Sequence, residues 1–203
     1  KPEQNVTEDS TLEPITDYSK FKAMCEDVLL KYGDDNFSIT ILRPATVCGY
    51  SKRQRFDLVV NILTNHAYNN RKITIFGGDQ MRPNIHIKDM VNSYLLILNE
   101  EKNKIKNQIF NVGFENYTVN NLANMVKEVV GNDVLIAKQQ TDDNRSYHIS
   151  SKKIIKLLNF KSLYTIGTAI EDLLNAFQNN YFQDPMSNEN YFNIKKMRSI
   201  DLK

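Results

Sequence analysis

The chain has 203 residues, of which 41% are hydrophobic and 25% charged, so it can bury a core and its composition excludes a disordered chain. Its formal net charge is +2 and its basic clusters are short, which predicts solvated basic surface and no nucleic-acid partner. No stretch approaches the roughly 20 apolar residues of a membrane span, so we expect no membrane partner and a cytoplasmic protein. Cys25 and Cys48 lie in apolar segments without metal-ligand spacing, which predicts two buried thiols and no metal.

The first predicted element is a helix over residues 15–32, which Gly33 is placed to end. Its expected buried face, from the helical spacing of apolar residues, consists of Phe21, Met24, Val28 and Leu29. Residues 37–42 form an alternating β-branched run that predicts a strand. We expect this strand to stop at the following Arg-Pro pair, because proline cannot donate to a ladder.

The middle of the chain alternates helices and strands. A second amphipathic helix is predicted over about residues 56–68, and a short strand over residues 73–76 is closed by a pair of glycines. A strongly apolar helix over residues 88–99 follows, and we expect an acidic residue or an asparagine to cap its start. Residues 108–113 predict another strand.

The last third continues the alternation. Thr118 is a plausible N-cap for the next helix, and residues 134–137 predict a strand. Ser150 is expected to cap a short helix, and residues 165–179 predict the last helix. The tail from Tyr181 is aromatic and polar without a clear period, so no element is predicted there.

Regular alternation of helices and strands predicts an α/β layered fold with a largely parallel sheet. Only the strands around Ile39 and Ile109 look like members of a central sheet, whereas those near Ile75 and Val134 fit a smaller side lobe. A doubly wound sheet cannot be built from two strands, so we expect most of it to come from elsewhere.

Tyr18 and Lys22 occupy positions i and i+4 of the first helix, so their side chains are expected on one face and in one cleft. An ammonium group beside a phenol favours phenolate, and such a tyrosine can exchange a proton with a sugar or alcohol hydroxyl near neutral pH. The spacing alone is common, and a half-exposed tyrosine beside a solvated lysine is the alternative.

Five motifs follow one another in a fixed order. They are "YSKFK" at 18–22, "ILRPATVCGY" at 41–50, "ITIFGGDQMRPNIHIKDMV" at 73–91, "IFNVG" at 109–113 and "RSYHISSKKIIKLLNF" at 145–160. In this order they resemble the extended short-chain dehydrogenase/reductase family, specifically its nucleotide-sugar epimerases and dehydratases. The resemblance covers roughly residues 3–178, and five ordered motifs are far more specific than any one of them.

The resemblance implies a role for each matched residue. Tyr18 would be the general acid/base, Lys22 its partner and ribose anchor, and Ala45 a backbone contact of the cofactor, which is NAD or, in its place, NADP. The implied contacts of the nucleotide-sugar substrate are Thr46, Asn61, Arg82, Arg145 and Tyr147.

Some of these roles have alternatives. Arg82 is the best binding candidate, because a guanidinium offers forked donors to diphosphate oxygens. Asn61 fits a helix cap equally well, and Arg145 could instead form a surface ion pair with a neighbouring aspartate. His86 and Asp89 look more like supports than catalytic groups.

The implied fold is the C-terminal part of a Rossmann-like doubly wound parallel sheet with a small α/β substrate-binding lobe. Residues 1–50 would end the dinucleotide-binding domain and carry the Tyr-x-x-x-Lys helix. Residues 51–82 would belong to the substrate lobe, 83–115 would return to the sheet, 116–180 would complete the lobe, and 181–203 would form a tail. Family members commonly dimerise through this helix, which implies a homodimer.

Two departures from the family pattern matter. Cys48 replaces the usual tyrosine before a glycine, which we read as a loss of packing. The chain also has no Gly-x-x-Gly-x-x-Gly motif at a strand-to-helix turn. We therefore expect the chain to be the C-terminal portion of a longer protein and to be inactive alone.

The implied function of that protein is an NAD-dependent nucleotide-sugar epimerase, which oxidises a sugar hydroxyl to a transient ketone and then reduces it. A 4,6-dehydratase or a 4-keto reductase of nucleotide sugars is the alternative within this class. A non-catalytic sugar-nucleotide-binding fragment is the alternative from another class.

Overall fold

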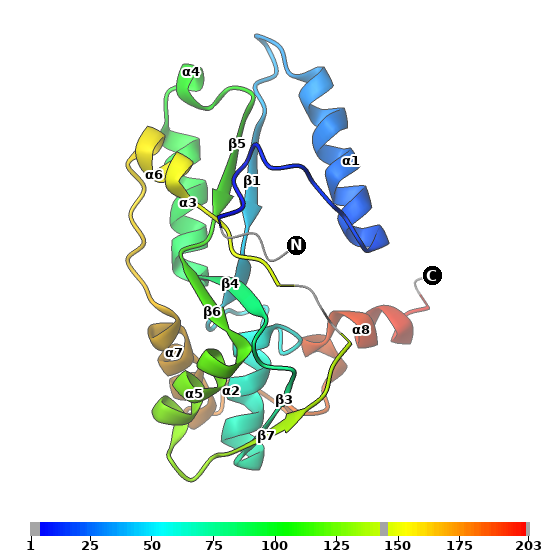
Figure 1. Ribbon diagram of the computed structural model, residues 1–203, viewed down its shortest axis with the longest axis vertical. Helices are drawn as coiled ribbons and strands as arrows, with labels where there is room; N and C mark the ends of the chain where they lie inside the picture. Colours follow the sequence, from blue (N-terminus) through cyan, green and yellow to red (C-terminus); the bar gives the residue numbers. More distant parts are fainter. Residues whose placement is uncertain (1–4, 143–145, 202–203) are drawn as a thin grey trace.

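The computed structural model describes residues 5–142 and 146–201 and has an upper and a lower lobe in the view of Figure 1. The helices are α1 (Asp17–Tyr32), α2 (Val59–Asn70), α3 (Ile87–Asn99), α4 (Lys102–Ile105), α5 (Val119–Val130), α6 (Lys152–Leu158), α7 (Ile166–Gln178), the 3-10 helix η1 (Glu189–Tyr191) and α8 (Asn193–Ser199). The strands are β1 (Thr40–Pro44), β2 (Thr46–Cys48), β3 (Lys72–Phe76), β4 (Met81–His86), β5 (Gln108–Val112), β6 (Glu115–Thr118) and β7 (Leu135–Gln139).

The strands form three small sheets. β1 pairs in parallel with β5, with Ile41 opposite Ile109, and β3 pairs in parallel with β7. These are the two pairs of strands that the sequence groups together, and the α/β class is confirmed. The third sheet, in which β4 pairs in parallel with β2 and antiparallel with β6, was not predicted. Its strands β2 and β6 are too short to show a period.

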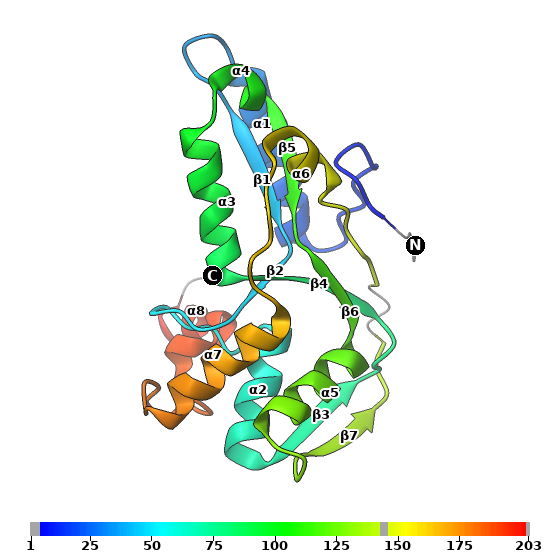
Figure 2. The same ribbon diagram turned by 90° about the vertical axis from the view of Figure 1, so that its left-hand side faces the viewer.

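The lower lobe packs α2, α5 and α7 around one apolar core beside β3 and β7 (Figure 2). Its fully buried members include Val60, Ile73, Leu122, Val126, Ile166 and Ile170. Thr118 caps α5 by accepting a hydrogen bond from the Asn121 backbone N–H, as predicted. This lobe therefore has a core of its own.

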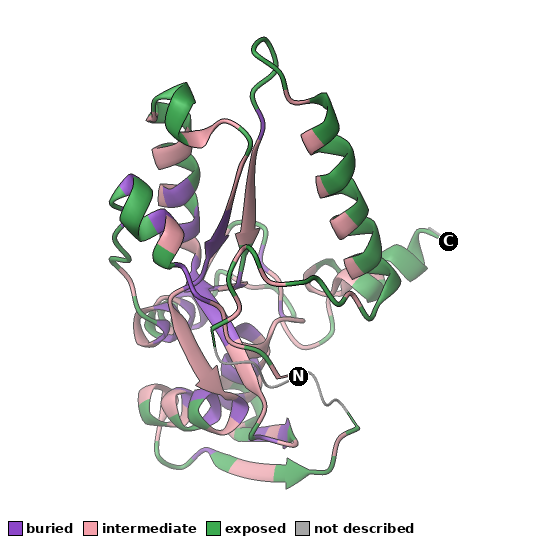
Figure 3. Ribbon diagram, turned by 45° about the horizontal axis from the view of Figure 1, so that its top comes forward, coloured by how far each residue is buried: buried purple, intermediate pink, exposed green. Residues whose placement is uncertain are grey.

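The upper lobe has a core on one face of the β1–β5 pair only. Phe110 and Val112 of β5 are fully buried in a cluster with Ile154 of α6 and Met90 of α3. On the other side stands α1, which has no buried residue (Figure 3). The two sides of β1–β5 are therefore packed very differently.

The predicted buried face of α1 is wrong for this chain, because Phe21, Met24, Val28 and Leu29 are 43–63% exposed. Helical spacing identifies an apolar face but does not say whether the same chain covers it. Cys25 on this helix is exposed as well, whereas Cys48 is buried as expected.

The unassigned tail folds back onto the chain. Its residues Phe182 and Tyr191 pack edge-on against Phe56, with ring centroids 5.0 and 5.1 Å away. The backbone N–H of Phe56 donates to the Tyr191 carbonyl, and Asn193 N–H donates to Asp57 Oδ2. The tail is therefore bonded to the loop that follows β2.

Candidate functional site

Tyr18 lies in the first turn of α1, where the helix start is well defined. Thr16 and Ser19 form a reciprocal capping box, which satisfies two backbone N–H groups of that turn. Both Tyr18 and Lys22 are exposed, and the Tyr18 side chain is 76% accessible. The phenol and the amine are therefore open to a ligand from solvent.

Ala45 joins the two upper sheets. Its N–H donates to the Val112 carbonyl at 2.8 Å, and the next residue, Thr46, begins β2 opposite Asn84 of β4. A Cβ atom at Gly113 would lie 2.4 Å from the Ala45 Cβ, so the chain approaches here too closely for any larger residue. Ala45 and Thr46 thus lie at the carboxyl ends of β1 and β5, where open α/β sheets bind their ligands.

Asn61 is buried in α2 and is not its N-cap, which is Leu58. Its Oδ1 accepts from the Gly49 backbone N–H at 3.1 Å, and its Nδ2 donates to the Arg55 carbonyl at 2.9 Å. The cap interpretation of Asn61 is therefore wrong. The amide instead braces the loop between β2 and α2.

Arg82 lies on β4, half-buried, and its Nη1 donates to the Met81 carbonyl. The neighbouring Met81 N–H donates to Ser146 Oγ at 3.0 Å, so the segment before α6 lies along β4. Tyr147 follows Ser146 and is exposed, whereas Arg145 lies outside the described residues.

An open pocket of about 790 Å³ lies between the turn after β3 and the segment after β7. It is lined by Gly77, Asp79, Gln80, Lys138, Gln139, Gln140, Thr141, Asp142 and Ser146. The two glycines of the predicted turn have φ angles of 75° and 126°, which favour glycine.

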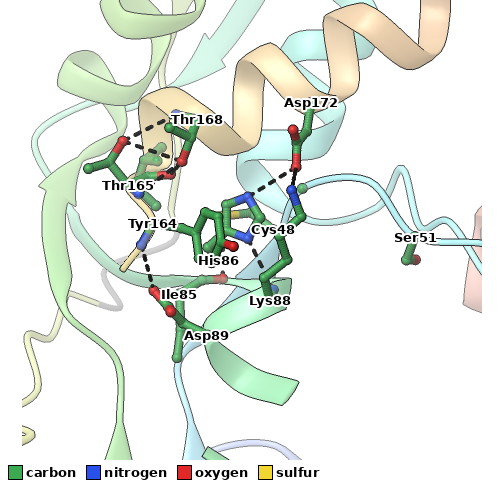
Figure 4. A network of polar contacts seen from close by, with 12 residues as sticks. Cys48, Ser51, Ile85, His86, Lys88, Asp89, Tyr164, Thr165, Thr168 and Asp172 are labelled. Carbon is green, nitrogen blue, oxygen red and sulfur yellow. Dashed lines mark hydrogen bonds and ion pairs between the residues drawn. The ribbon is translucent and has the colours of Figure 1, made fainter. Parts of the chain in front are cut away.

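His86 and Asp89 lie in a network of polar contacts at the start of α3 (Figure 4). Asp89 is fully buried and accepts hydrogen bonds from Leu163 N–H and Tyr164 N–H, at 3.1 and 3.0 Å. These bonds fix the segment before α7 to α3, as a support would.

His86 is the N-cap of α3, so the expectation of an acidic or asparagine cap is wrong. Its Nδ1 accepts from the Lys88 backbone N–H at 3.0 Å, which assigns the imidazole proton to Nε2. Nε2 lies 3.4 Å from Asp172 Oδ2 of α7, and the ring stacks on Tyr164. A neutral imidazole nitrogen can accept a hydrogen bond from a backbone N–H at the start of a helix, as a carboxylate does. The presence of a histidine does not by itself indicate this capping role.

The stability of the protein is expected to fall as the pH drops below about 6.5, the ordinary pKa of histidine. Burial lowers the pKa of His86, while Asp172 opposes this shift, so the unfolded chain binds the proton more readily than the folded one. We expect the decrease in unfolding free energy between pH 7.5 and 5.5 to be smaller in His86→Asn, whose amide can still cap α3. Chemical denaturation at both pH values measures this difference, and equal decreases would contradict it.

Residues 1–113, more than half of the chain, match the sequence model of the NAD dependent epimerase/dehydratase family. The chain therefore belongs to this family. A UDP-glucose 4-epimerase of Lactobacillus helveticus is 28% identical over an alignment of 147 residues, and the match covers 64% of this chain and 44% of that protein.

Two solved structures share the fold. The UDP-glucose 4-epimerase of Thermotoga maritima superposes with a TM-score of 0.76 at 24% identity, covering 87% of this chain and 58% of that one. The dTDP-glucose 4,6-dehydratase of Bacillus anthracis, solved with NAD, gives 0.77 at 18% identity, covering 91% and 60%. The chain thus spans 44–60% of the length of these relatives.

No helix within residues 5–142 and 146–201 is long and apolar enough to cross a membrane. In the same part of the chain, no group of His, Cys, Asp and Glu side chains is arranged to hold a metal ion.

Proposed function

We propose that this chain is the C-terminal portion of a cytoplasmic, homodimeric NAD-dependent nucleotide-sugar epimerase, and that it supplies the acid/base tyrosine and the substrate-binding lobe. The observation that carries the proposal is the position of Tyr18 and Lys22. They share one face at the start of α1, and in Figure 1 this end of α1 lies level with the carboxyl end of β1. The division into a dinucleotide-binding part before residue 50 and a substrate lobe of residues 51–82 and 116–180 belongs to the same proposal.

The residues present fit the nicotinamide-ribose end of the cofactor. Lys22 would hold the ribose, and the Ala45 backbone would contact the nicotinamide. The seven glycines are scattered, so the sequence has no glycine-rich turn that could cradle the dinucleotide phosphates. When bound there, the cofactor would supply the hydride chemistry of the reaction, as acceptor and then donor of the sugar's hydride.

In the proposed reaction, the residues of this chain would transfer the proton of the sugar hydroxyl and bind the nucleotide sugar. Tyr18 would take the proton of a sugar hydroxyl while that carbon is oxidised to a ketone, and it would return the proton on reduction. Lys22 would act as the charged partner of Tyr18, one helical turn further along α1. Arg82 would bind the diphosphate with Asn61 beside it. Thr46 would lie on the substrate side of its loop, and Tyr147 and Arg145 would lie over the nucleotide.

Two alternatives to the epimerase, another enzyme of the same class and a non-catalytic fragment, also have observations in their favour. The dTDP-glucose 4,6-dehydratase matches the fold as well as the epimerase does, so a dehydratase or a 4-keto reductase remains the alternative within this class. The missing glycine motif supports a non-catalytic, sugar-nucleotide-binding fragment. Turnover by the longer protein would separate the enzymes from the fragment.

Isothermal titration of the 203-residue chain with UDP-glucose tests the binding role of Arg82. We expect Arg82→Gln to weaken binding by about 10–100-fold, because the variant loses a charged, forked donor to the diphosphate. Arg71→Gln is the matched control, since Arg71 pairs with Asp133 at the far end of the lower lobe. Equal affinities of Arg82→Gln and the unmodified chain would remove Arg82 from the site.

Titration of the same chain with NAD tests whether the phosphate-binding part of the cofactor site lies outside these 203 residues. Little or no NAD binding is expected from this chain alone, and tight binding would contradict the proposal that the phosphate cradle lies elsewhere.

A further inference from the structure

The helix that carries Tyr18 and Lys22 has little apolar contact to hold it. None of its residues is buried, and Phe21, Met24, Val28 and Leu29 are exposed to solvent. In the described part of the chain, a single ion pair connects α1 to a strand, and it joins Glu26 to Arg43 of β1. The orientation of α1 relative to the sheet therefore depends strongly on this contact.

The Arg43–Glu26 pair has the geometry of a strong interaction. Arg43 Nη2 lies 2.6 Å from Glu26 Oε2, and Arg43 Nε lies 3.0 and 3.1 Å from the two carboxylate oxygens. The two side chains are only 19% and 18% exposed. Such a forked, partly desolvated pair is less screened and more directional than a surface ion pair.

Arg43 also fixes the segment that leads to α1. Its Nη1 donates to the Glu8 carbonyl at 3.2 Å, while Glu8 Oε1 accepts from the Asn111 backbone N–H of β5. One guanidinium thus contacts both the helix and the chain that precedes it, two residues before Ala45.

The spacing along α1 relates this anchor to the proposed acid/base. Tyr18, Lys22 and Glu26 are separated by four residues each, so they lie along one face of the helix. A contact that holds Glu26 against β1 therefore fixes the rotation of α1 about its axis. Tyr18 is about 12 Å from the anchor along the helix, so a small change of angle at Glu26 displaces the phenol.

We propose that the Arg43–Glu26 ion pair is a positioning element, which holds Tyr18 and Lys22 toward the ligand-binding ends of β1 and β5 without touching the substrate. The inference rests on the proposed function of Tyr18. The sequence alone does not indicate this pair, because its partners are 17 residues apart on different elements.

Glu26→Gln tests the proposal, because it removes the charge and keeps the shape. In the 203-residue chain, we expect hydrogen exchange of the α1 amides to become at least about 10-fold faster, with exchange in β5 and α5 unchanged. Asp27→Asn is the matched control, an exposed acid on the same helix, and it should leave exchange unchanged. Unchanged α1 exchange in Glu26→Gln would overturn the proposal.

Kinetics of the longer enzyme distinguish a contact that positions Tyr18 from one that only stabilises α1. We expect Glu26→Gln to lower kcat by about 10–100-fold with the KM of the nucleotide sugar within about 3-fold, because a misplaced acid/base impairs the reaction more than binding. Arg43→Gln should lower kcat at least as much, because Arg43 also holds the Glu8 carbonyl, and the double variant should be no worse than Arg43→Gln alone. Faster exchange with an unchanged kcat would show a structural tether only and overturn the proposal.

The two hypotheses fail differently. Full turnover in Tyr18→Phe would remove the proposed function and with it the positioning role, whatever the exchange data show. A low rate in Tyr18→Phe with an unchanged rate in Glu26→Gln would overturn the positioning role alone.

Discussion

Tyr18→Phe is expected to reduce turnover of the longer enzyme by about 10²–10⁴-fold, the range that a general acid/base contributes. The variant loses one hydroxyl and keeps the ring, so the substrate would still bind but its proton would have no acceptor. Because the sugar-nucleotide contacts proposed here lie on other elements, the dissociation constant for UDP-sugar should change by less than about 3-fold. Steady-state kinetics together with calorimetric titration measure the two quantities separately.

Tyr32→Phe provides the matched control. Tyr32 is the last residue of the same helix and is 70% exposed, so its hydroxyl is equally accessible but lies at the opposite end. We expect this variant to retain full turnover. An unimpaired rate in Tyr18→Phe would remove Tyr18 from the mechanism.

Phe56→Ala should lower the free energy of unfolding by about 3–5 kcal/mol, because it removes a fully buried aromatic ring and leaves a cavity. Phe56 stacks on Phe177 of α7 and meets Phe182 and Tyr191 of the tail edge-on. The substitution would therefore loosen the tail and the loop after β2 together. Chemical denaturation followed by circular dichroism measures the loss.

Phe37→Ala is its control, since Phe37 is 54% exposed in the bend between α1 and β1. A change of about 0.5 kcal/mol or less is expected there. A loss below about 1 kcal/mol in Phe56→Ala would mean that the aromatic cluster contributes little to stability.

Much of the fold could be predicted from local patterns. The period of apolar residues located α2, α3, α5 and α7 to within a few residues, and alternation located β5. Alternation found β1 only in part, and the expected stop at the Arg-Pro pair is wrong, because β1 runs through Pro44 and pairs there with β5. Their parallel pairing is compatible with the long connection between them, which includes α2 and α3, since parallel strands need such a crossover. These predictions succeed because helix and strand periods are properties of neighbouring residues.

Predictions failed where an element depends on a distant partner. The cap of α3 is His86, whose ring is held by Asp172, 86 residues further along the chain. The aromatic residues of the tail have no period because they pack on Phe56 and Phe177 from irregular backbone. Asn61 could be placed on a helix, but not on the loop carbonyl and N–H that occupy its amide.

The sequence by itself determined that Tyr18 and Lys22 share one helix face, that the fold is α/β, and that the motifs follow the order of one enzyme family. These features depend on local spacing and on the order of segments. Only the tertiary structure decided that α1 is uncovered, that Arg43 and Glu26 join it to β1, and that the tail closes over the loop after β2. Those contacts join residues far apart in the chain. They depend on side-chain geometry in three dimensions, which no local sequence period encodes.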